Sequence, residues 1–527
     1  MNSEDTNVLT SEVELAANKA ATSPGEHEKE NRNHDHINTD HLLPDLKRRT
    51  ISGGMVTMSA QAAKFGLNLV ATVILARLLT PQDFGVVAMV TAVTGFLVMF
   101  KHAGLSTPTI QREHITHAQV SNLFWINLAV SGLCAFALAA LSPVIARFYH
   151  ESKITYITLA LSTTFLIGGF RVQHLALLKR QMRFKAIALI EVGSMAIGVF
   201  VGIAMALLHY RYWSLVGLNL ATEIASFLLT GMVSRWKPQL PTRNSGIGPL
   251  VAFGVHQTAG NFIFSLAGGC DNLLIGRFYG PAAVGLYSRA AALVSRPMEQ
   301  FLLPVNAVFL PTLSRLQSQP ARYRATFLRL YEAIALIVFF LSSLLLALAL
   351  PVTLVLLGRK WEQASTIFAA FTFMALQLPL SSAANWLLTS QGRGKDIFRV
   401  TSINALLTLA SFIAGLPFGP LGVAIAFSAT GLLVRLPILY YAAGRRGPVT
   451  TSDLWTRLLR HLPLWLLMLV VTWVMRAIVA DLHPLAQLLI CAAVGVFTGL
   501  AFISIFRPHR EVAIHLLETV REFRTNR

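Results

Sequence analysis

Polar and charged side chains interrupt two long apolar stretches of this sequence, at spacings that place them on one face of a helix. Lys64 has Gln61 three residues before it and Asn68 four residues after it, and such positions lie on the same side of an α-helix. A cation held away from water attracts an anion more strongly than a solvated cation does. The pattern predicts that these side chains face a cavity and bind an anionic group. The alternative is a buried ion pair between Lys64 and either Glu191 or Glu223.

A second polar stripe lies in the other half of the chain, where Arg289, Arg296 and Gln300 follow one another at intervals of seven and four residues. Prolines recur every seven residues in the same stretch, at Pro297, Pro304 and Pro311. Proline removes a backbone hydrogen bond and bends a helix, so we expect a bent helix whose arginines face the cavity. The alternative is that Arg296 pairs with Glu299 or lies near lipid headgroups.

No sequence motif indicates catalysis. The chain has no Walker A loop, no GxSxG or HExxH motif, and no pair of carboxylates at a spacing suited to acid–base work. The three cysteines lie far apart inside apolar stretches, at Cys134, Cys270 and Cys491. That distribution provides neither a disulfide framework nor the spacing of a metal site. We therefore predict no catalytic residue, no metal site and no cofactor.

The composition identifies the kind of element that must position these stripes. Hydrophobic residues make up 54% of the 527 residues, charged residues only 13%, and the mean hydropathy is +0.58. A soluble domain carries about 25% charged residues. The apolar runs are uninterrupted over roughly twenty residues, the length of a membrane-spanning helix, whereas barrel strands alternate over about ten. The sequence predicts an all-α polytopic membrane protein.

Fourteen segments are long enough to cross about 30 Å of hydrocarbon at 1.5 Å per residue. The first half of the chain contains the expected spans 54–77, 84–103, 119–146, 154–174, 186–208 and 213–234. The second half contains the expected spans 250–276, 284–311, 331–357, 365–389, 399–416 and 421–442. Two more are expected at 462–480 and 485–506.

The formal net charge of +19 reflects membrane topology in this chain. Most cations lie in alternate short loops between the expected spans, such as 179–185 and 393–399, while the intervening loops hold few. Loops rich in lysine and arginine stay on the cytoplasmic side. We therefore predict that both termini are cytoplasmic, which requires an even number of spans, and we expect no nucleic-acid partner.

One motif occurs twice in this chain: an apolar run, a proline turn and a second apolar run. The matching residues are offset by 200 positions: Arg77 and Arg277, Pro81 and Pro281, Gly85 and Gly285. Internal repeats determine architecture. Six spans in each copy return the chain to its starting side, so the two copies run in the same sense. Parallel halves of this kind place a substrate site between them, which rocking exposes to either face.

The expected domains follow from this repeat and from the composition of the two ends. The first 49 residues hold ten of the 25 acidic residues and few large apolar ones, a composition typical of disorder. We expect a disordered acidic cytoplasmic tail at 1–49, a six-helix N-lobe at 50–243, a six-helix C-lobe at 244–444, two additional spans at 445–510 and a basic cytoplasmic tail at 511–527.

Four further residues near the repeated turn are candidates for gating or coupling. Arg77 and Arg277 each precede the proline turn, where a long side chain reaches the outer interface; the alternative is that they gate an outward cavity. Asp271 and Asn272 open the second copy of the motif, and Asp271 either binds a coupling cation or pairs with an arginine. Arg435 is expected at the membrane interface.

Several separate motifs resemble the WzxC-type polysaccharide flippases. They are residues 74–127, residues 271–290 with the sequence DNLLIGRFYGPAAVGLYSRA, and the shorter LPTLSRLQ at 310–317 and WLLTSQGR at 386–393. The resemblance implies the fold of the multidrug/oligosaccharidyl-lipid/polysaccharide (MOP) exporter superfamily. In the related lipid II flippases, two lobes enclose a cationic cavity, and a groove beside the last two helices is proposed to hold the lipid tail.

The resemblance also implies a function in the bacterial inner membrane. Members of this branch are thought to move undecaprenyl-diphosphate-linked oligosaccharide across it for exopolysaccharide or lipopolysaccharide synthesis. The implied partners are this lipid-linked oligosaccharide, membrane lipids, and a polysaccharide polymerase with its export machinery. The alternative is a cation-coupled small-molecule or drug exporter of the same superfamily, which usually has twelve spans and acidic coupling residues in the first lobe. A membrane glycosyltransferase is disfavoured because the expected outer loops are short.

Overall fold

The computed structural model describes residue 37 and residues 44–102, 105–243, 245–252, 254 and 269–525. The expected tail at 1–49 lies almost wholly outside these residues. Within them, the regular structure is helical and contains no strand. Eleven of the described helical segments are long and apolar enough to cross a membrane. The prediction of an all-α polytopic membrane protein is confirmed.

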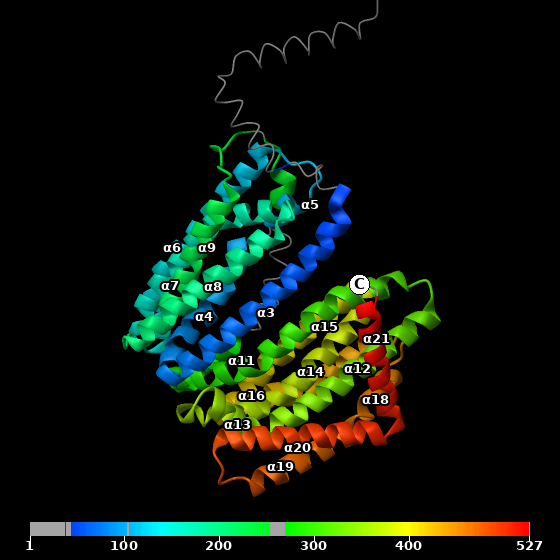
Figure 1. Cartoon of the computed structure of the whole chain (residues 1–527). Helices are drawn as coiled ribbons and strands as arrows, with labels where there is room; N and C mark the ends of the chain where they lie inside the picture. Colours follow the sequence, from blue (N-terminus) through cyan, green and yellow to red (C-terminus); the bar gives the residue numbers. More distant parts are fainter. Residues whose placement is uncertain are drawn as a thin grey trace, which may run out of the picture.

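The N-lobe is formed by the first seven described helices (Figure 1, blue to teal). They are α3 (Leu46–Leu78), α4 (Pro81–His102), α5 (Ser106–Gln111), α6 (His117–Tyr149), α7 (Lys153–Arg180), α8 (Phe184–Leu207) and α9 (Trp213–Ser234). Helix α6 starts at a capping box, in which the side chains of Thr116 and Gln119 each accept a hydrogen bond from the other residue's backbone N–H. Helix α3 packs against α8, and α7 packs against α6 and α9.

The C-lobe follows with α11 (Cys270–Arg315), α12 (Pro320–Ala347), α13 (Ala349–Leu356), η2 (Arg359–Trp361), α14 (Ala364–Ser390), α15 (Gly394–Gly415), η3 (Leu416–Phe418), α16 (Gly419–Thr430), η4 (Gly431–Arg435) and α17 (Leu436–Gly444). Helix α11 contains the expected break between two spans, because two helical segments join there at a kink. Its one internal non-helical residue is Gly280, with φ 77° and ψ −177°, a conformation that glycine adopts without steric cost. The predicted turn between two helices is therefore present, at Gly280 directly before Pro281.

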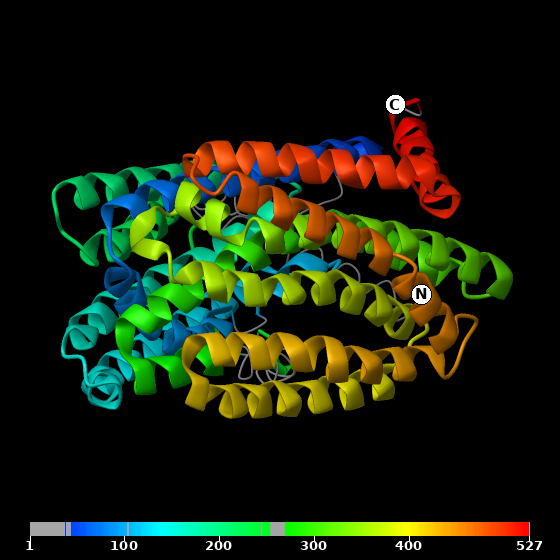
Figure 2. The ribbon, with the colours of Figure 1, turned by 90° about the horizontal axis from the view of Figure 1, so that it is seen from below.

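The chain ends with α18 (Thr451–Leu459), α19 (Leu462–Ile478), α20 (Pro484–Ile505) and α21 (Arg507–Thr525). Helices α19 and α20 pack against each other and against α12 of the C-lobe. Leu336 of α12, Leu464 and Met468 of α19, and Phe502 of α20 form a small core between them. Figure 2 shows these helices (orange and red) along one edge of the C-lobe, with α15 to α17 along the opposite edge. Most of the expected basic tail is helical, in α21.

The expected count of fourteen spans is not confirmed. The expected span 250–276 lies largely outside the described residues, and 284–311 falls in α11, which is not among the eleven apolar segments. The expected spans 399–416 and 421–442 both lie in one apolar stretch, Gly394–Gly444. Gly419 interrupts that stretch with a φ of 74°, and α15 and α16 on either side of it pack against each other.

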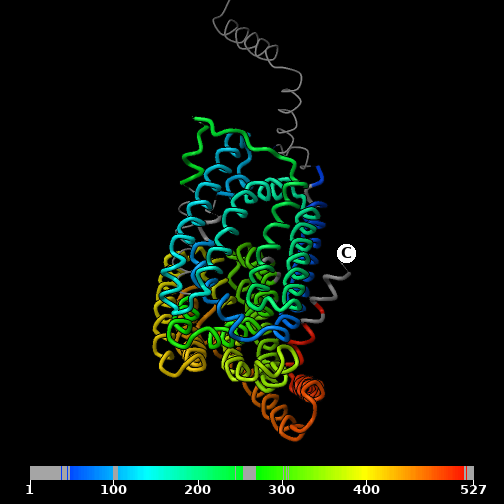
Figure 3. The backbone as a smooth tube through the Cα atoms, turned by 90° about the vertical axis from the view of Figure 1, so that its left-hand side faces the viewer, coloured from blue at the N-terminus to red at the C-terminus, as the bar shows by residue number. Residues whose placement is uncertain are grey.

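The two lobes meet at α4 and α11, where the repeated glycines lie. A Cβ atom on Gly85 would lie 1.6 Å from the carbonyl oxygen of Pro281, and one on Gly285 would lie 1.9 Å from that of Pro81. No side chain fits at either position, so the two copies of the motif touch backbone to backbone. Figure 1 shows the lobes converging at this end and diverging toward the other, and Figure 3 views the converging end directly. We call this contact the seal.

Candidate functional site

A cavity of about 910 Å³ lies between the lobes, beyond the seal. Its walls come from α3, α4 and α11 on one side and from C-lobe helices α14 to α16 on the other. The walls include all six residues predicted to bind substrate: Gln61, Lys64, Asn68, Arg289, Arg296 and Gln300. The structure thus brings the two polar stripes together, although they are more than 200 residues apart. Their role in binding stays a prediction.

Lys64 both lines the cavity and forms an ion pair. Its Nζ lies 2.9 Å from Oε2 of Glu191 on α8, and each side chain is about 30% exposed. Glu223 pairs instead with Arg171, at 3.4 Å. Lys64 therefore lines the cavity and also makes the ion pair with Glu191, while its role in binding an anion stays a prediction. The carboxylate holds the ammonium group in position and offsets part of its charge.

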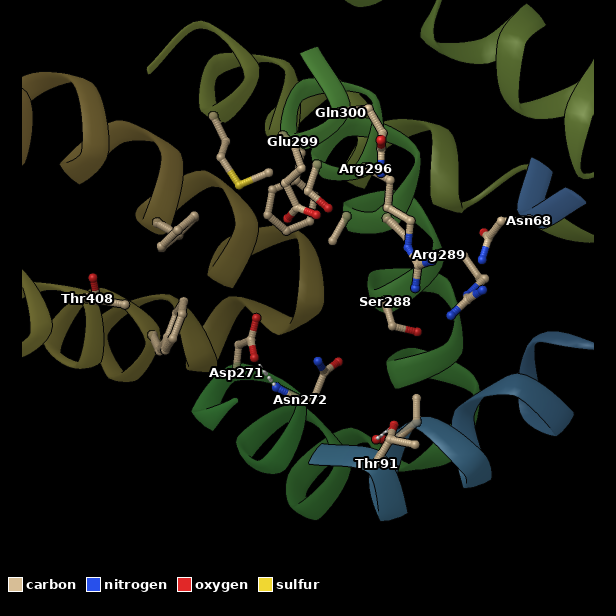
Figure 4. Close-up of a pocket in the computed structure, with 18 of the residues that line it drawn as sticks. Asn68, Thr91, Asp271, Asn272, Ser288, Arg289, Arg296, Glu299, Gln300 and Thr408 are labelled. Atoms are coloured by element: carbon tan, nitrogen blue, oxygen red, sulfur yellow. Dashed lines mark hydrogen bonds between the residues drawn. The ribbon is translucent and has the colours of Figure 1, made fainter. Parts of the chain in front are cut away.

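Arg289 and Arg296 face the cavity without a carboxylate partner among the described residues. Figure 4 shows both side chains projecting into the same space beside Asn68. The guanidinium carbon of Arg289 lies 4.9 Å from the ring centre of Phe84, and its buried Nε has no hydrogen-bond partner in the described part of the chain. No ion pair forms between Arg296 and Glu299, so that alternative is not observed. Two unpaired guanidinium groups in one hollow favour the binding of an anion.

Asp271 and Asn272 also line the cavity, at the first turn of α11. Oδ2 of Asp271 accepts a hydrogen bond of 3.0 Å from the Tyr287 hydroxyl, and Oδ1 accepts one of 2.7 Å from the backbone N–H of Asn272. No arginine pairs with Asp271 among the described residues, so the expected alternative of an ion pair is not observed. A coupling role for Asp271 and Asn272 stays a prediction.

Arg435 lines the cavity rather than the membrane interface, which corrects the expectation from the sequence. It ends η4, a single π-helical turn, and such turns are frequent at functional sites. Its Nη1 donates to Thr408 Oγ1 at 2.8 Å and its Nη2 donates to the carbonyl of Phe427 at 2.6 Å. These bonds turn the guanidinium group inward, into the C-lobe. Sequence reasoning missed this cavity residue because the wide turn shifts the helical register that predicts side-chain direction.

Arg77 and Arg277 lie outside the cavity wall, and each reaches from one lobe to the other. Nη2 of Arg77 donates to the carbonyl of Val355 on α13 at 2.7 Å. Nη1 of Arg277 lies 3.0 Å from Nδ1 of His150, between α6 and α7. Both copies of the repeated arginine thus connect the lobes near the seal. A gating role requires this geometry, and it stays a prediction.

Trp361 packs beside the seal, and the sequence analysis did not identify it as a candidate residue. Its side chain is fully buried, its Nε1 donates to the carbonyl of Ala76 at 2.8 Å, and its ring lies 5.3 Å from that of Phe84, edge to face. Phe84 therefore separates the buried indole from the guanidinium group of Arg289. Elsewhere in the described residues, no group of three His, Cys, Asp or Glu side chains is placed to hold a metal ion.

Comparison with known proteins now gives the chain a family. The model of the family described as "Polysaccharide biosynthesis protein" matches residues 74–366, more than half of the chain. The teichuronic acid biosynthesis protein TuaB of Bacillus subtilis (strain 168) is 26% identical over 388 residues, which cover 72% of this chain and 79% of TuaB. The lipopolysaccharide biosynthesis protein WzxC of Escherichia coli (strain K12) is 24% identical over 398 residues, covering 74% and 79%.

Solved structures show the same fold at low sequence identity. The lipid II flippase MurJ in an inward closed conformation matches with a TM-score of 0.68 and 16% identity, covering 88% of this chain and all of MurJ. A multidrug resistance MATE family transporter of the MOP superfamily, inward-facing, matches with a TM-score of 0.58 and 13% identity, covering 75% and 96%. The resemblance to WzxC-type proteins is confirmed: the chain belongs to the polysaccharide biosynthesis protein family and has the fold of the MOP exporter superfamily.

Proposed function

We propose that this protein is a flippase that moves undecaprenyl-diphosphate-linked oligosaccharide across the bacterial inner membrane, for exopolysaccharide or lipopolysaccharide synthesis. One observation carries the proposal. A cavity between two lobes, sealed at one end, gathers Lys64, Arg289, Arg296 and Arg435 from both halves of the chain. The names of the relatives, which concern teichuronic acid and lipopolysaccharide synthesis, agree with it.

The chemistry of the cavity suits a diphosphate linked to a sugar. Guanidinium groups donate two parallel hydrogen bonds to phosphate oxygens, and they remain charged in a partly desolvated site. Arg289 and Arg296 are available for this because no described carboxylate pairs with them. Amide and hydroxyl side chains on the C-lobe wall, at Asn404 and Thr408, offer hydrogen bonds to the sugars.

Transport follows from alternating access of the cavity. With both termini on the cytoplasmic side, as the loop charges predict, the lobes diverge toward the cytoplasm and the seal closes the outer face. Substrate enters from the inner leaflet, and the lobes then rock apart at Gly85 and Gly285 to release it outside. The sequence offers no nucleotide site, so an ion gradient, the membrane potential or consumption of the product by a polysaccharide polymerase must drive the cycle. The protein acts as a transporter and performs no catalysis in this proposal.

Genetic complementation tests the proposal. In a host from which the gene is deleted, wild-type protein restores surface polysaccharide, and we expect Lys64→Ala and Arg296→Ala to abolish restoration at normal protein levels. Arg510→Ala is the matched control, because Arg510 is exposed on α21, remote from the cavity wall. Full restoration by both cavity variants would contradict the proposal, as would unchanged surface polysaccharide in the deletion host.

The second candidate is a cation-coupled exporter of small molecules. It is favoured by Asp271, a carboxylate that faces the cavity without an arginine partner among the described residues. The acids deep in the first lobe are less suited to coupling, because Glu191 pairs with Lys64 and Glu223 pairs with Arg171. Drug-sensitivity assays separate the candidates: an exporter raises drug tolerance, whereas the flippase leaves it unchanged.

A further inference from the structure

A second basic cavity lies at the opposite end of the N-lobe from the seal. It has a volume of about 510 Å³ and is bounded by the start of α3 and by the loop between α7 and α8. Its charged lining residues are Arg48, Arg49, Arg183 and Lys185, with Asp45 as the single acid. None of the four cations forms an ion pair with a carboxylate in the described part of the chain. The cavity therefore carries an uncompensated positive charge.

The loop that bears Arg183 occurs again in the second lobe. Matching residues are 210 positions apart: Gln181 and Gln391, Arg183 and Arg393, Lys185 and Lys395, Ile187 and Ile397. The backbones also correspond, with a φ of 52° at residue 182 and 67° at residue 392. The N–H groups of the paired arginines donate to the carbonyls of Leu178 at 3.0 Å and of Leu388 at 2.9 Å. The two loops are copies of one structure.

The copies differ in how their arginine is neutralised. Arg393 donates from Nε to Oδ2 of Asp396 at 2.9 Å and from Nη1 to the carbonyl of Ala443 at 2.9 Å, and Arg445 also binds Asp396. At the position of Asp396, the first copy has Ala186, which lines the basic cavity. The side chain of Arg183 makes only one hydrogen bond among the described residues, from Nη1 to the carbonyl of Val233 at 3.3 Å. The second loop thus contains its own counter-ion, and the first loop lacks one.

The basic cavity lies at the boundary of the membrane. Apolar spans begin at Arg48 and at Phe184, and another ends at Arg180. An adjoining hollow shares Asp45, Arg48 and Ser52 with the cavity and adds Pro44, Ile51 and Met55. Ile51 and Met55 are 57% and 46% exposed. These side chains occupy a different face of α3 from Lys64 and Asn68, which line the central cavity. The cations lie at the start of the span, and the exposed apolar side chains follow further along it. This order matches a phospholipid, whose phosphate lies at the membrane surface and whose acyl chains lie deeper.

We propose that the Arg48, Arg49, Arg183 and Lys185 cavity binds the phosphate headgroup of an anionic phospholipid, with the acyl chains along Ile51 and Met55. Basic pockets between helices at the cytoplasmic side are suited to such headgroups, and each nearby cation contributes substantially to the attraction. Gly53 and Phe184 both line the cavity and pack closely, because a Cβ at Gly53 would lie 2.2 Å from the Phe184 ring. The bound lipid holds the start of α3 against α8, and α3 carries Lys64.

Native mass spectrometry of the full-length protein in detergent tests this proposal. Dioleoylphosphatidylglycerol is the anionic probe, dioleoylphosphatidylcholine is the neutral probe, and inorganic phosphate is the headgroup-only probe. We expect phosphatidylglycerol to remain bound in preference to phosphatidylcholine. Arg49→Gln and Arg183→Gln each lower the affinity for phosphatidylglycerol about fivefold, the effect of one cation near a membrane surface. Salt weakens binding in the wild type because the groups are partly exposed.

The repeated loop supplies the decisive variants. Ala186→Asp gives the first loop the counter-ion of the second, and we expect it to lower phosphatidylglycerol binding about as much as the loss of an arginine. Lys395→Gln, in the second loop, is the matched control and leaves binding unchanged. The proposal is overturned by unchanged binding in Ala186→Asp and Arg183→Gln, by equal retention of phosphatidylcholine, or by full competition from equimolar inorganic phosphate. None of these results depends on whether the central cavity carries oligosaccharide.

Discussion

Helices α4 and α11 form the seal and also line part of the central cavity, and their side chains differ between the two places. At the seal, Gly85 and Gly285 bring α4 and α11 together backbone to backbone. One helical turn after Gly285, Arg289 projects into a cavity of about 910 Å³. The absence of a side chain at Gly285 lets the lobes touch, whereas Arg289 borders an open cavity. The change from Gly285 to Arg289 along one face of α11 therefore marks the boundary between the seal and the central cavity.

The largest expected effect comes from filling the seal. In Gly85→Val the new side chain meets the carbonyl oxygen of Pro281, where even a Cβ would lie at 1.6 Å. Backbone cannot yield as a flexible side chain does, so we expect the lobes to be unable to close at this end and polysaccharide export to be lost. Export by the deletion host, at measured protein level, checks this.

Gly95→Val is the control for that experiment, because Gly95 lies on the same helix and a Cβ there meets no atom within 4 Å. We expect it to support export. Normal export by Gly85→Val would show that the lobes need not touch at the repeated glycines, and would remove the distinction between seal and cavity.

The next effect concerns the cavity. Arg296→Ala removes a charged hydrogen-bond donor, and bonds of this kind contribute about 1.5–3 kcal/mol, so we expect at least tenfold weaker binding of a short-chain prenyl diphosphate. Arg296→Lys keeps the charge but loses the planar pair of donors, and should lie between the two. Titration calorimetry on purified protein measures both, and equal affinities in all three proteins would refute the assignment.

A smaller effect is expected at the arginines beside the seal. Arg77→Ala removes the bond to Val355, and Arg277→Ala removes the contact with His150. Both side chains are exposed, so each change should raise the outward-open population only about threefold. Labelling of a cysteine introduced at Ser288 with a membrane-impermeant maleimide from the outside reports this population. Labelling rates identical to those of the parent would indicate that the arginines only anchor the interface.

The smallest effect should come from Trp361→Phe. Phenylalanine keeps an aromatic ring against Phe84 but cannot donate to the carbonyl of Ala76, and the loss of such a bond costs about 1 kcal/mol. We expect slightly lower thermal stability in detergent and preserved export. A variant as stable as the wild type would show that the hydrogen bond adds nothing to the seal.

The sequence predicted the parts of this molecule that follow from periodicity. The offset of 200 residues located Gly85 and Gly285, and helical spacing located Lys64 and Arg289. It could not predict that the two glycines touch each other, because a repeat specifies two similar units and not their mutual contact. The structure supplies that contact.

Features that depend on irregular backbone or on distant partners were missed. Arg435 turns inward because of a π-helical turn, which no spacing rule anticipates. Trp361 looks like an ordinary interfacial aromatic residue until its partner, the carbonyl of Ala76, is known.

Lipid translocation by the reconstituted protein tests the central claim most directly. Vesicles containing a fluorescent undecaprenyl-diphosphate-linked sugar are prepared with wild-type protein, with an Arg289→Ala and Arg296→Ala double variant, or without protein, under an ion gradient and a membrane potential. We predict that only the wild type moves the label to the opposite leaflet, where an impermeant reductant reaches it. Equal translocation by wild type and double variant, or none above protein-free vesicles, would contradict it.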